Sequence, residues 1–316
     1  MFLEDLEGSP SFEIINLVLK KIENGEKVLS LAIGEPSFDT PKEIVEAGAR
    51  SLRSGDVHYV SSYGIPEVRK AIQGKVSRKN RIRSGIANTI FCTTKLSVYA
   101  SLVAVSNRAF DALIPDPGYF YAAPALLAGG RPISYELNED FSLNLDEIKR
   151  KATRRTKAIL VNTPGNPTGK VLSRNELVEL YDFCRERGIY VISDEAYEDL
   201  VYGKRHFSVG SLEKKPEFVI SIFSLSKSYA MTGWRAGYIV ASERMIQLIN
   251  RFIENTVSCF PPFIQKASAF ALENCDDRIA EFRHELALRK KLLEEEIDKI
   301  DQIGRASCRE RVYVLV

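Results

Sequence analysis

The chain has 316 residues, of which 45% are hydrophobic and 27% are charged. This composition excludes a disordered polymer, which has fewer apolar residues, and a collagen or coiled coil, whose compositions are biased and periodic. The 44 basic and 42 acidic residues give a net charge of +2. That balance lacks the basic excess of nucleic-acid-binding proteins, so we expect no nucleic-acid partner.

The amino terminus and the cysteines bear on where the protein is located. The first residues, MFLEDLEGSP, lack the basic start and apolar segment of a signal peptide. No apolar run approaches the roughly 18 residues that span a bilayer. The five cysteines form no CxxC pair, which favours a reducing compartment over a disulfide framework or a zinc site. These features predict a cytoplasmic protein with no membrane partner.

The last residues differ in character from the rest of the chain. Apolar residues recur at helical spacing from about Asp276 to Ile300, and this pattern stops at Asp301. Residues 303–312 read IGRASCRERV, which resembles the translation of a common sequencing adapter. We therefore expect residues 303–316 to be a non-native tail on a chain that has been cut short; the alternative is an ordinary basic tail.

Helical and apolar segments alternate from Thr40 onward. A helix is predicted to begin at Thr40, with Pro41 at its first position and Glu43 three residues after the cap. A second helix opens with a capping box at Ser173 and ends at Gly188. Short apolar runs, typical of buried strands, lie at residues 89–92, 112–114, 158–161, 189–192 and 218–223. The pattern predicts an α/β fold with a mainly parallel sheet and helices on both faces.

Polar residues follow three of these predicted strands, at the sheet edge where ligands bind in such folds. They supply an amide in NTPGNPTG (162–169), a carboxylate with a phenol in SDEAYEDLVY (193–202), and a lysine with a nearby arginine in SLSKSYAMTGWRAGY (224–238). Each has an ordinary explanation, since NPTG suits a turn, an aspartate can cap a helix and a loop lysine is usually solvated. Their order and their shared position at strand ends favour a single site.

With three further segments, these motifs resemble the fold-type-I pyridoxal-phosphate enzymes, specifically the class I/II aminotransferases of the aspartate aminotransferase-like branch. The further segments are LAIGEPSFDTP (31–41), HYVSSYGIPEVRKAI (58–72) and IPDPGY (114–119). The resemblance covers about residues 31–272. It implies an enzyme that uses pyridoxal 5'-phosphate to move an amino group from an amino acid to a 2-oxo acid, in a homodimer with shared active sites.

The resemblance also implies a role for each matched residue. Lys227 matches the lysine that holds the cofactor as a Schiff base and then moves a proton as general base and acid. Asp194 matches the carboxylate beside the pyridine nitrogen, where a negative charge favours the protonated ring. The other matches are Asn166 and Tyr197 to the donors for the ring 3-oxygen, Tyr119 to the aromatic that stacks on the cofactor, and Asn166 and Gly34 to substrate-binding positions.

The cofactor phosphate needs cations and hydrogen-bond donors. The resemblance assigns this role to Ser224, to Arg235 and, from the neighbouring subunit, to Tyr59. The segment containing Thr93, Thr94 and Lys95 departs from the family, which has glycine at the position of Thr94. A β-branched residue resists the backbone angles that glycine accepts, so we expect weaker cofactor binding than is normal for the family.

The same resemblance divides the chain into domains. Residues 1–39 match the amino-terminal segment of a small domain, residues 40–272 the cofactor-binding large domain, and residues 273–302 a long helix that starts the rest of the small domain. The family continues beyond this point and there holds the arginine that binds the substrate α-carboxylate. We expect the chain as written to be poorly soluble and to lack useful transaminase activity.

Three other functions stay open at this stage. The first is a carbon–sulfur β-lyase or another elimination enzyme on the same scaffold. The second is the cofactor-binding module of a transcription regulator, which the balanced charge and the 30 residues before LAIGEP disfavour. The third is an α/β protein without a cofactor. The motifs do not specify the amino donor.

Overall fold

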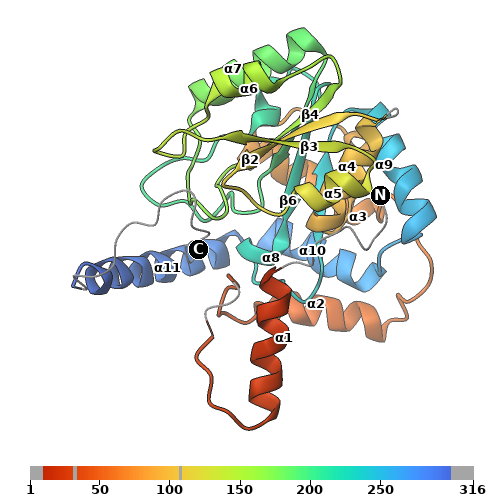
Figure 1. Cartoon of the computed structure of the whole chain (residues 1–316). Helices are drawn as coiled ribbons and strands as arrows, with labels where there is room; N and C mark the ends of the chain where they lie inside the picture. The colour runs from red at the N-terminus through yellow and green to blue at the C-terminus, as the bar shows by residue number, and fades with distance from the viewer. Residues whose placement is uncertain (1–9, 31–33, 107–108, 300–316) are drawn as a thin grey trace.

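The computed structural model describes residues 10–30, 34–106 and 109–299; the tail predicted at residues 303–316 lies outside them. A seven-stranded sheet lies at the centre, with helices on both of its faces (Figure 1). The strands are β1 (Thr89–Phe91), β2 (Asp111–Asp116), β3 (Arg131–Glu136), β4 (Thr156–Asn162), β5 (Tyr190–Asp194), β6 (Val219–Ser224) and β7 (Gly237–Val240). Their order across the sheet is β1-β7-β6-β5-β4-β2-β3.

The predicted mainly parallel sheet is confirmed. Strands β3, β2, β4, β5 and β6 pair in parallel, and only β7 pairs antiparallel with its neighbours β6 and β1. The five predicted strands correspond to β1, β2, β4, β5 and β6. The sequence reasoning missed β3 and β7. Pro132 argues against a central strand, and β3 is an edge strand, where proline is tolerated. Strand β7 is four residues long.

The helices cover the two faces of the sheet in separate groups. Figure 1 shows α6 and α7 on one side of the sheet, and α4, α5 and α9 on the other. The helices are α1 (Pro10–Glu23), α2 (Lys42–Arg53), α3 (Pro66–Lys75), α4 (Thr94–Val105), α5 (Ala122–Leu127), α6 (Leu145–Lys151), α7 (Arg174–Arg187), α8 (Leu225–Ser228), α9 (Glu243–Thr256), α10 (Pro262–Asn274) and α11 (Asp276–Ile297), with short turns η2 (Val76–Asn80), η3 (Ile86–Asn88) and η4 (Val209–Leu212).

The central strands are apolar on both faces because each face has its own core. Successive side chains of a strand point to opposite sides of the sheet. In β4, Ala158 and Leu160 belong to the core that contains residues of α3, α4, α9 and α10. Ile159 and Val161 belong to the second core, which lies under α6 and α7. A strand buried on both faces loses the polar alternation of a surface strand, which is why these runs are apolar throughout.

One predicted helix start is confirmed and one is wrong. The Ser173 hydroxyl caps α7, the Glu176 carboxylate accepts from the Ser173 amide at 2.8 Å, and Gly188 ends the helix at φ 66°. Helix α2 begins at Lys42 rather than at Thr40, and no side chain caps it. The Thr40 hydroxyl instead donates to the carbonyl of Ala230 at 2.6 Å, so a tertiary contact replaces the expected cap.

Helix α11 extends away from the sheet (Figure 1) and contacts the segment that precedes α2. The ring of Phe282 stacks on Phe38 at a centroid distance of 4.5 Å, and Arg278 pairs with Glu43 at 2.7 Å. The first contact joins α11 to the segment before α2, and the second joins it to the first turn of α2. The predicted domain boundaries stay a prediction.

Candidate active site

The ends of three neighbouring parallel strands bring the sequence motifs together. Strands β4, β5 and β6 lie side by side, and Asn162 pairs in register with Asp194. The segments that follow carry Asn166, Tyr197 and Lys227. This edge of the sheet is the place where the sequence predicts a ligand site.

Asp194 is a buried carboxylate, 6% exposed, at the end of β5. One of its oxygens accepts from the Tyr121 hydroxyl at 3.0 Å, and the other accepts from the Ala196 amide at 3.1 Å. Burial raises the pKa of Asp194 from 3.8 to about 6, although both hydrogen bonds oppose the rise. Within the described ranges no lysine, arginine or histidine forms an ion pair with it. The site therefore offers a buried anion that lacks a cation.

Asn166 and Tyr197 form a hydrogen-bonded pair beside Asp194. The Asn166 amide donates to the Tyr197 hydroxyl at 3.1 Å. Burial, and then the negative charge of Asp194, raise the pKa of Tyr197, so its phenol stays protonated. Two hydrogen-bonding groups thus face the same place, one from the loop after β4 and the other from the loop after β5.

Lys227 lies opposite this pair, in the short helix α8. Its ammonium lies 5.7 Å from the centre of the Tyr197 ring and donates to the carbonyl of Gly34. Burial lowers the pKa of Lys227, the carboxylate of Glu35 opposes this, and the positive charge of Arg235 adds to it. A lysine with a lowered pKa is a better nucleophile and proton acceptor near neutral pH.

Tyr119 lies between the two charged groups of the site. Burial raises the pKa of this half-buried phenol, Asp194 raises it further, and Arg235 opposes the rise. Its ring packs edge-on against Tyr121, at a centroid distance of 5.6 Å. Tyr119 is therefore close enough to both Asp194 and Arg235 for their charges to act on it.

Arg235 and Ser224 lie on either side of Lys227 in the chain. Arg235 adopts a positive φ of 56°, which is uncommon for a residue with a side chain. Its guanidinium donates to the carbonyl of Thr232 at 2.9 Å. The Ser224 hydroxyl accepts from the Ser226 amide at 3.2 Å and caps α8. The carbonyl of Thr232 therefore holds the exposed guanidinium of Arg235 close to the loop that follows α8.

The segment with Thr93, Thr94 and Lys95 corrects one expectation. Thr93 is the extended residue that precedes α4, and Thr94 is the first residue of that helix. Thr94 is not among the described residues with a positive φ, so the backbone strain expected from the missing glycine is absent. Its buried hydroxyl has no hydrogen-bond partner among the described residues. The Lys95 ammonium lies 5.5 Å from the centre of the Phe12 ring.

Tyr59 lies apart from the other predicted site residues of its own chain. Its side chain is 92% exposed. The loop that carries it is held in place, because the carbonyl of Tyr63 accepts from the Phe91 amide at 3.0 Å and Gln265 accepts from the Ile65 amide at 2.7 Å. A fixed loop thus presents an aromatic hydroxyl away from its own chain.

Two residues that contact this site were not singled out from the sequence. The hydroxyl of Tyr121 donates to Asp194, and the only signal for it was a second tyrosine two residues after Tyr119. The side-chain amide of Asn162 donates to the backbone carbonyl of Asp194 at 3.0 Å. The side-chain oxygen of Asn162 accepts from the backbone amide of Asn166 at 2.6 Å. Asn162 therefore links the two loops, and it is the first residue of the NTPGNPTG motif.

The comparisons with known proteins show the family of this chain. The family model of aminotransferase class I and II matches residues 26–314. The chain is 40% identical over 277 residues to the aspartate aminotransferase of Pyrococcus abyssi, covering 84% of this chain and 70% of the relative. It is 38% identical to aromatic-amino-acid aminotransferase 2 of Thermococcus litoralis, covering 85% of this chain and 71% of the relative.

Solved structures show the same fold. The aspartate aminotransferase of Thermus thermophilus with maleate superposes with a TM-score of 0.90 at 29% identity, covering 94% of this chain and 79% of that one. These relatives lend no support to the lyase alternative. None of the helices in the described part of the chain is long and apolar enough to cross a membrane. The chain belongs to the class I and II aminotransferases, and it is a pyridoxal-phosphate-dependent transaminase that acts on amino acids and 2-oxo acids.

Proposed function

We propose that Lys227, Asp194, Tyr197, Asn166 and Tyr119 form the cofactor site of this transaminase. The observation that carries the proposal is the buried carboxylate of Asp194, which lacks a cation within the described residues. A protonated pyridine ring supplies the missing positive charge, and the half-buried lysine supplies an amine. When bound, pyridoxal phosphate supplies an aldehyde and an electron-accepting ring, which together let an amino group leave one substrate and join another.

Each residue then has a physical task. Asp194 keeps a proton on the ring nitrogen, because a buried anion favours the charged form of its neighbour. Asn166 and Tyr197 donate hydrogen bonds to the ring 3-oxygen. Lys227 removes the proton from the substrate Cα as a general base and later donates a proton as a general acid. Its lowered pKa suits it to both steps. Tyr119 provides the surface on which the ring stacks.

We propose that the phosphate is bound by Arg235, Ser224 and the start of α4. The guanidinium fork of Arg235 matches the geometry of a phosphate. The amino terminus of α4 presents free amides and the positive end of the helix dipole. Thr93, Thr94 and Lys95 lie at this terminus, and the unpartnered buried hydroxyl of Thr94 is available there as a donor. Gly34, whose carbonyl contacts Lys227, lies on the substrate side.

Replacement of Lys227 tests this site directly. We expect Lys227→Ala to abolish the visible absorption band that pyridoxal phosphate gives when it is bound through a lysine. Lys170→Ala serves as the matched control, because Lys170 pairs with Asp140 on a neighbouring loop. A band that persists in Lys227→Ala, or is lost equally in Lys170→Ala, contradicts the assignment.

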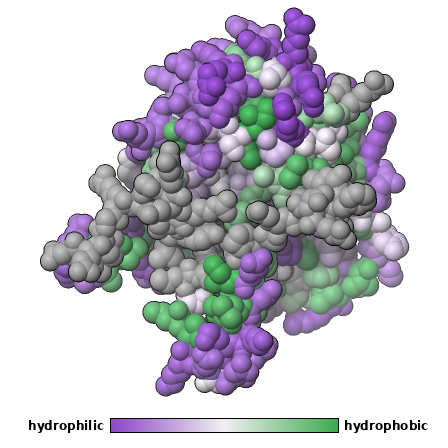
Figure 2. All heavy atoms as spheres, in the orientation of Figure 1, coloured by the Kyte–Doolittle hydropathy of each residue, from purple (hydrophilic) through white to green (hydrophobic). Residues whose placement is uncertain are grey.

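We propose a homodimer in which Tyr59 reaches the cofactor phosphate of the partner subunit. Two features support it: the outward-facing Tyr59 on a fixed loop, and exposed apolar side chains on α1, among them Phe12, Leu17, Leu19 and Ile22. Figure 2 shows apolar side chains gathered near the lower edge of the molecule, where α1 lies in Figure 1. An exposed apolar surface of this kind is typical of an interface.

A mixed dimer distinguishes the two subunits. Chains with Tyr59→Ala and chains with Lys227→Ala are refolded together. If Tyr59 acts across the interface, the mixed dimer has one intact site and binds cofactor normally at half occupancy. If Tyr59 acts within its own chain, no intact site forms. A chain that stays monomeric in light scattering also contradicts the proposal.

We propose that the amino donor belongs to the range that the relatives' names span, namely aspartate and aromatic amino acids. A probable aspartate/prephenate aminotransferase of Aquifex aeolicus, 36% identical, adds prephenate as an acceptor to test. The measurement is conversion of the bound cofactor to its amino form by single donors. Equal rates for aspartate, tyrosine, lysine and alanine would contradict any such preference.

We propose a cytoplasmic location. The support is that Cys92, Cys184, Cys259 and Cys275 are all free thiols, as a reducing compartment maintains. Fractionation of the native host with an antibody to the chain tests this, and recovery outside the cytoplasmic fraction would contradict it.

A further inference from the structure

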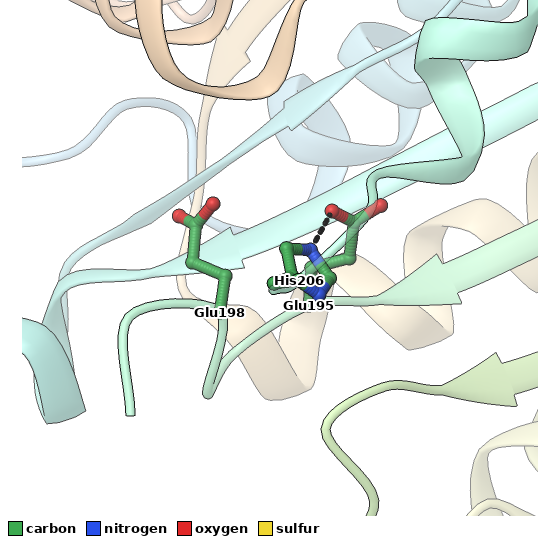
Figure 3. Close-up of side chains that lie close together, drawn as sticks. All are labelled: Glu195, Glu198 and His206. Carbon is green, nitrogen blue, oxygen red and sulfur yellow. Dashed lines mark hydrogen bonds and ion pairs between the residues drawn. The ribbon is translucent and has the colours of Figure 1, made fainter. Parts of the chain in front are cut away.

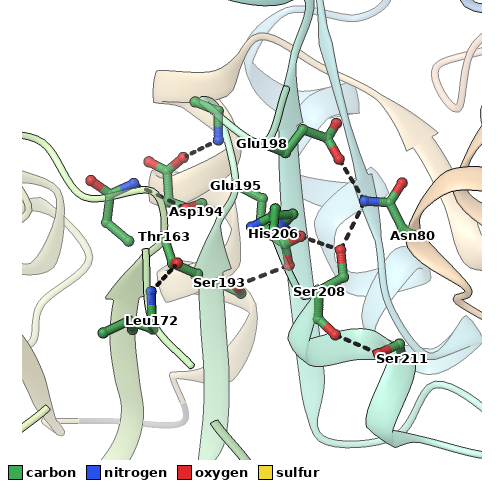
Figure 4. A network of polar contacts seen from close by, with 12 residues as sticks. Asn80, Thr163, Leu172, Ser193, Asp194, Glu195, Glu198, His206, Ser208 and Ser211 are labelled. Carbon is green, nitrogen blue, oxygen red and sulfur yellow. Dashed lines mark hydrogen bonds and ion pairs between the residues drawn. The ribbon is translucent and has the colours of Figure 1, made fainter. Parts of the chain in front are cut away.

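A second set of polar residues lies behind the segment that carries Asp194 and Tyr197. Figure 4 shows Asp194 on one side of this segment and Glu198, His206, Ser208 and Asn80 on the other. We call the group formed by Lys75, Asn80, Glu195, Glu198, His206 and Ser208 the reverse-face network. None of its members forms a hydrogen bond with the proposed cofactor-binding groups in the structure, so any effect on the cofactor passes through the chain between them.

Glu195 is the centre of the network and is fully buried. One of its oxygens accepts from the Ser193 hydroxyl at 3.0 Å. The other contacts the His206 ring at 2.9 Å and also accepts from the Ser208 hydroxyl (Figure 4). Burial disfavours a charged His206 ring, but the hydrogen bond and negative charge of Glu195 outweigh it and raise the pKa of His206.

Lys75 and Glu198 form the other half of the network. The Lys75 side chain is 1% exposed, and its ammonium contacts Glu198 and donates to Asn80 at 2.9 Å. The Asn80 amide donates to Glu198 at 2.5 Å and to Ser208 at 2.8 Å. Segments 75–80, 193–198 and 206–208 are thereby joined through directional hydrogen bonds.

The carboxylates of the network have donors without a bound cation, whereas the buried Nδ1 of His206 has no hydrogen-bond partner among the described residues. Ligand atoms of Glu195, Glu198 and His206 lie within 4.8 Å of one another, which is close enough for a metal site (Figure 3). However, each carboxylate oxygen of the two glutamates already contacts a donor of the protein. The Lys75 ammonium also pairs with Glu198 and supplies a positive charge. The charges of the chain itself therefore satisfy this site.

The network can affect the cofactor site because it lies on the opposite side of the segment that carries Asp194 and Tyr197 (Figure 4). Neighbouring side chains at the end of a strand point to opposite faces, so fixing Glu195 on one face sets the direction of Asp194 on the other. Glu198 follows Tyr197 directly and contacts Lys75. Buried hydrogen bonds to charged groups hold one geometry more narrowly than apolar contacts do.

We propose that the reverse-face network positions Asp194 and Tyr197 for the cofactor, with the contact between Glu195 and His206 at its centre. The inference rests on the proposed cofactor site. It makes Glu195 and His206 positioning residues, which act through the segment 193–198 rather than on the cofactor.

The test compares variants of the network with a matched variant elsewhere in the sheet. Glu195→Ala removes the central acceptor, Glu195→Gln keeps one acceptor oxygen, and Ser208→Ala removes a single hydrogen bond in case the others fail to fold. Asp111→Asn is the control, because Asp111 is also a fully buried carboxylate but lies at the opposite end of the sheet. Asp194→Asn and Tyr197→Phe test the cofactor site itself.

Three quantities are measured on the full chain. They are the dissociation constant of pyridoxal phosphate, the amide hydrogen exchange of residues 195–200 without cofactor, and the pH at which the absorption band of the bound cofactor changes. We expect Glu195→Ala to weaken cofactor binding by about tenfold, in the range of couplings within one hydrogen-bond network. We also expect it to speed exchange and move the transition pH, with Glu195→Gln recovering part of each effect.

The outcomes separate the alternatives. If Asp111→Asn destabilises the protein equally and weakens cofactor binding equally, the network acts only through stability and the inference is wrong. If Asp194→Asn and Tyr197→Phe weaken binding but the Glu195 variants do not, the inference is wrong and the site stands. If none of the variants affects binding, both the proposed site and the inference fail.

Discussion

Two buried carboxylates at opposite ends of the same sheet have opposite environments. Asp111, at the start of β2, accepts two hydrogen bonds from the Arg131 guanidinium at 3.0 and 3.1 Å and one from Thr153 at 2.9 Å. Burial acts to raise its pKa, but Arg131 and Thr153 outweigh it and the pKa of Asp111 is lowered. Asp194, at the end of β5, has only neutral donors among the residues that the structure describes, and its pKa is raised to about 6.

The difference distinguishes a structural group from a functional one. The chain satisfies Asp111 with its own cation, so this carboxylate stabilises the fold as it stands. The described chain leaves Asp194 without a cation, which costs stability in the cofactor-free protein and creates affinity for a positive group from outside. The cofactor-free protein is therefore less stable because of this site, and binding of a positively charged ligand restores that stability.

The largest expected effect is that replacing these two carboxylates changes two different quantities, cofactor binding for Asp194 and stability for Asp111. Asp194→Asn should weaken pyridoxal phosphate binding by about 3–5 kcal/mol, on the order of 100-fold or more, because the ring nitrogen loses its buried partner. Asp111→Asn should leave binding unchanged but lower the free energy of unfolding by about 1–3 kcal/mol. Cofactor titration and urea unfolding measure the two quantities. Similar binding by both variants would show that Asp194 is not the cofactor's counter-ion.

The next effect is on the pH dependence of stability without cofactor. The folded-state pKa of Asp194 lies near 6, above its usual 3.8, so the folded protein holds this proton more tightly than the unfolded chain. Its contribution to the free energy of unfolding should therefore fall by about 2 kcal/mol as the pH rises from 4 to 6. Asp111, with a lowered pKa, should instead lose its contribution as the pH falls. Subtracting the unfolding free energies of Asp194→Asn from those of the unaltered chain isolates the first effect; a flat difference would contradict it.

The smallest effect concerns Tyr121. Its hydroxyl stabilises the charged form of Asp194, so Tyr121→Phe should raise the pKa of Asp194 by about one unit. The midpoint of the same pH series measures this shift. Tyr135→Phe is the matched control, because that buried hydroxyl donates to the carbonyl of Leu160 at 2.8 Å instead. If both variants shift the midpoint equally, the hydrogen bond from Tyr121 is not the cause.

Much of the fold could be predicted because its signals are local. The apolar runs of β4, β5 and β6 reflect burial on both faces, and the capping box at Ser173 reflects a helix start. Strand β3 escaped because it is an edge strand containing Pro132. The start of α2 was misplaced because the hydroxyl of Thr40 contacts Ala230, a residue far away in the sequence.

In the candidate site too, local motifs could be predicted and features that depend on the tertiary structure could not. Asn166, Asp194, Tyr197 and Lys227 stand in recognisable motifs after predicted strands, and the structure brings them to one edge of the sheet. Thr94 does not adopt a glycine-like backbone angle, because the family position of a glycine does not reveal the backbone angle of its replacement; weaker cofactor binding stays a prediction. Only the tertiary structure shows whether a helix begins there.

By itself, the sequence determined the fold class, the family and the order of the reacting groups, since these depend on strand periodicity and on motifs of a few adjacent residues. The tertiary structure decided which charges are balanced. It placed Arg131 against Asp111, Lys75 against Glu198 and only neutral donors against Asp194. The cause is that the pKa of a buried group depends on neighbours that folding brings together from distant parts of the chain.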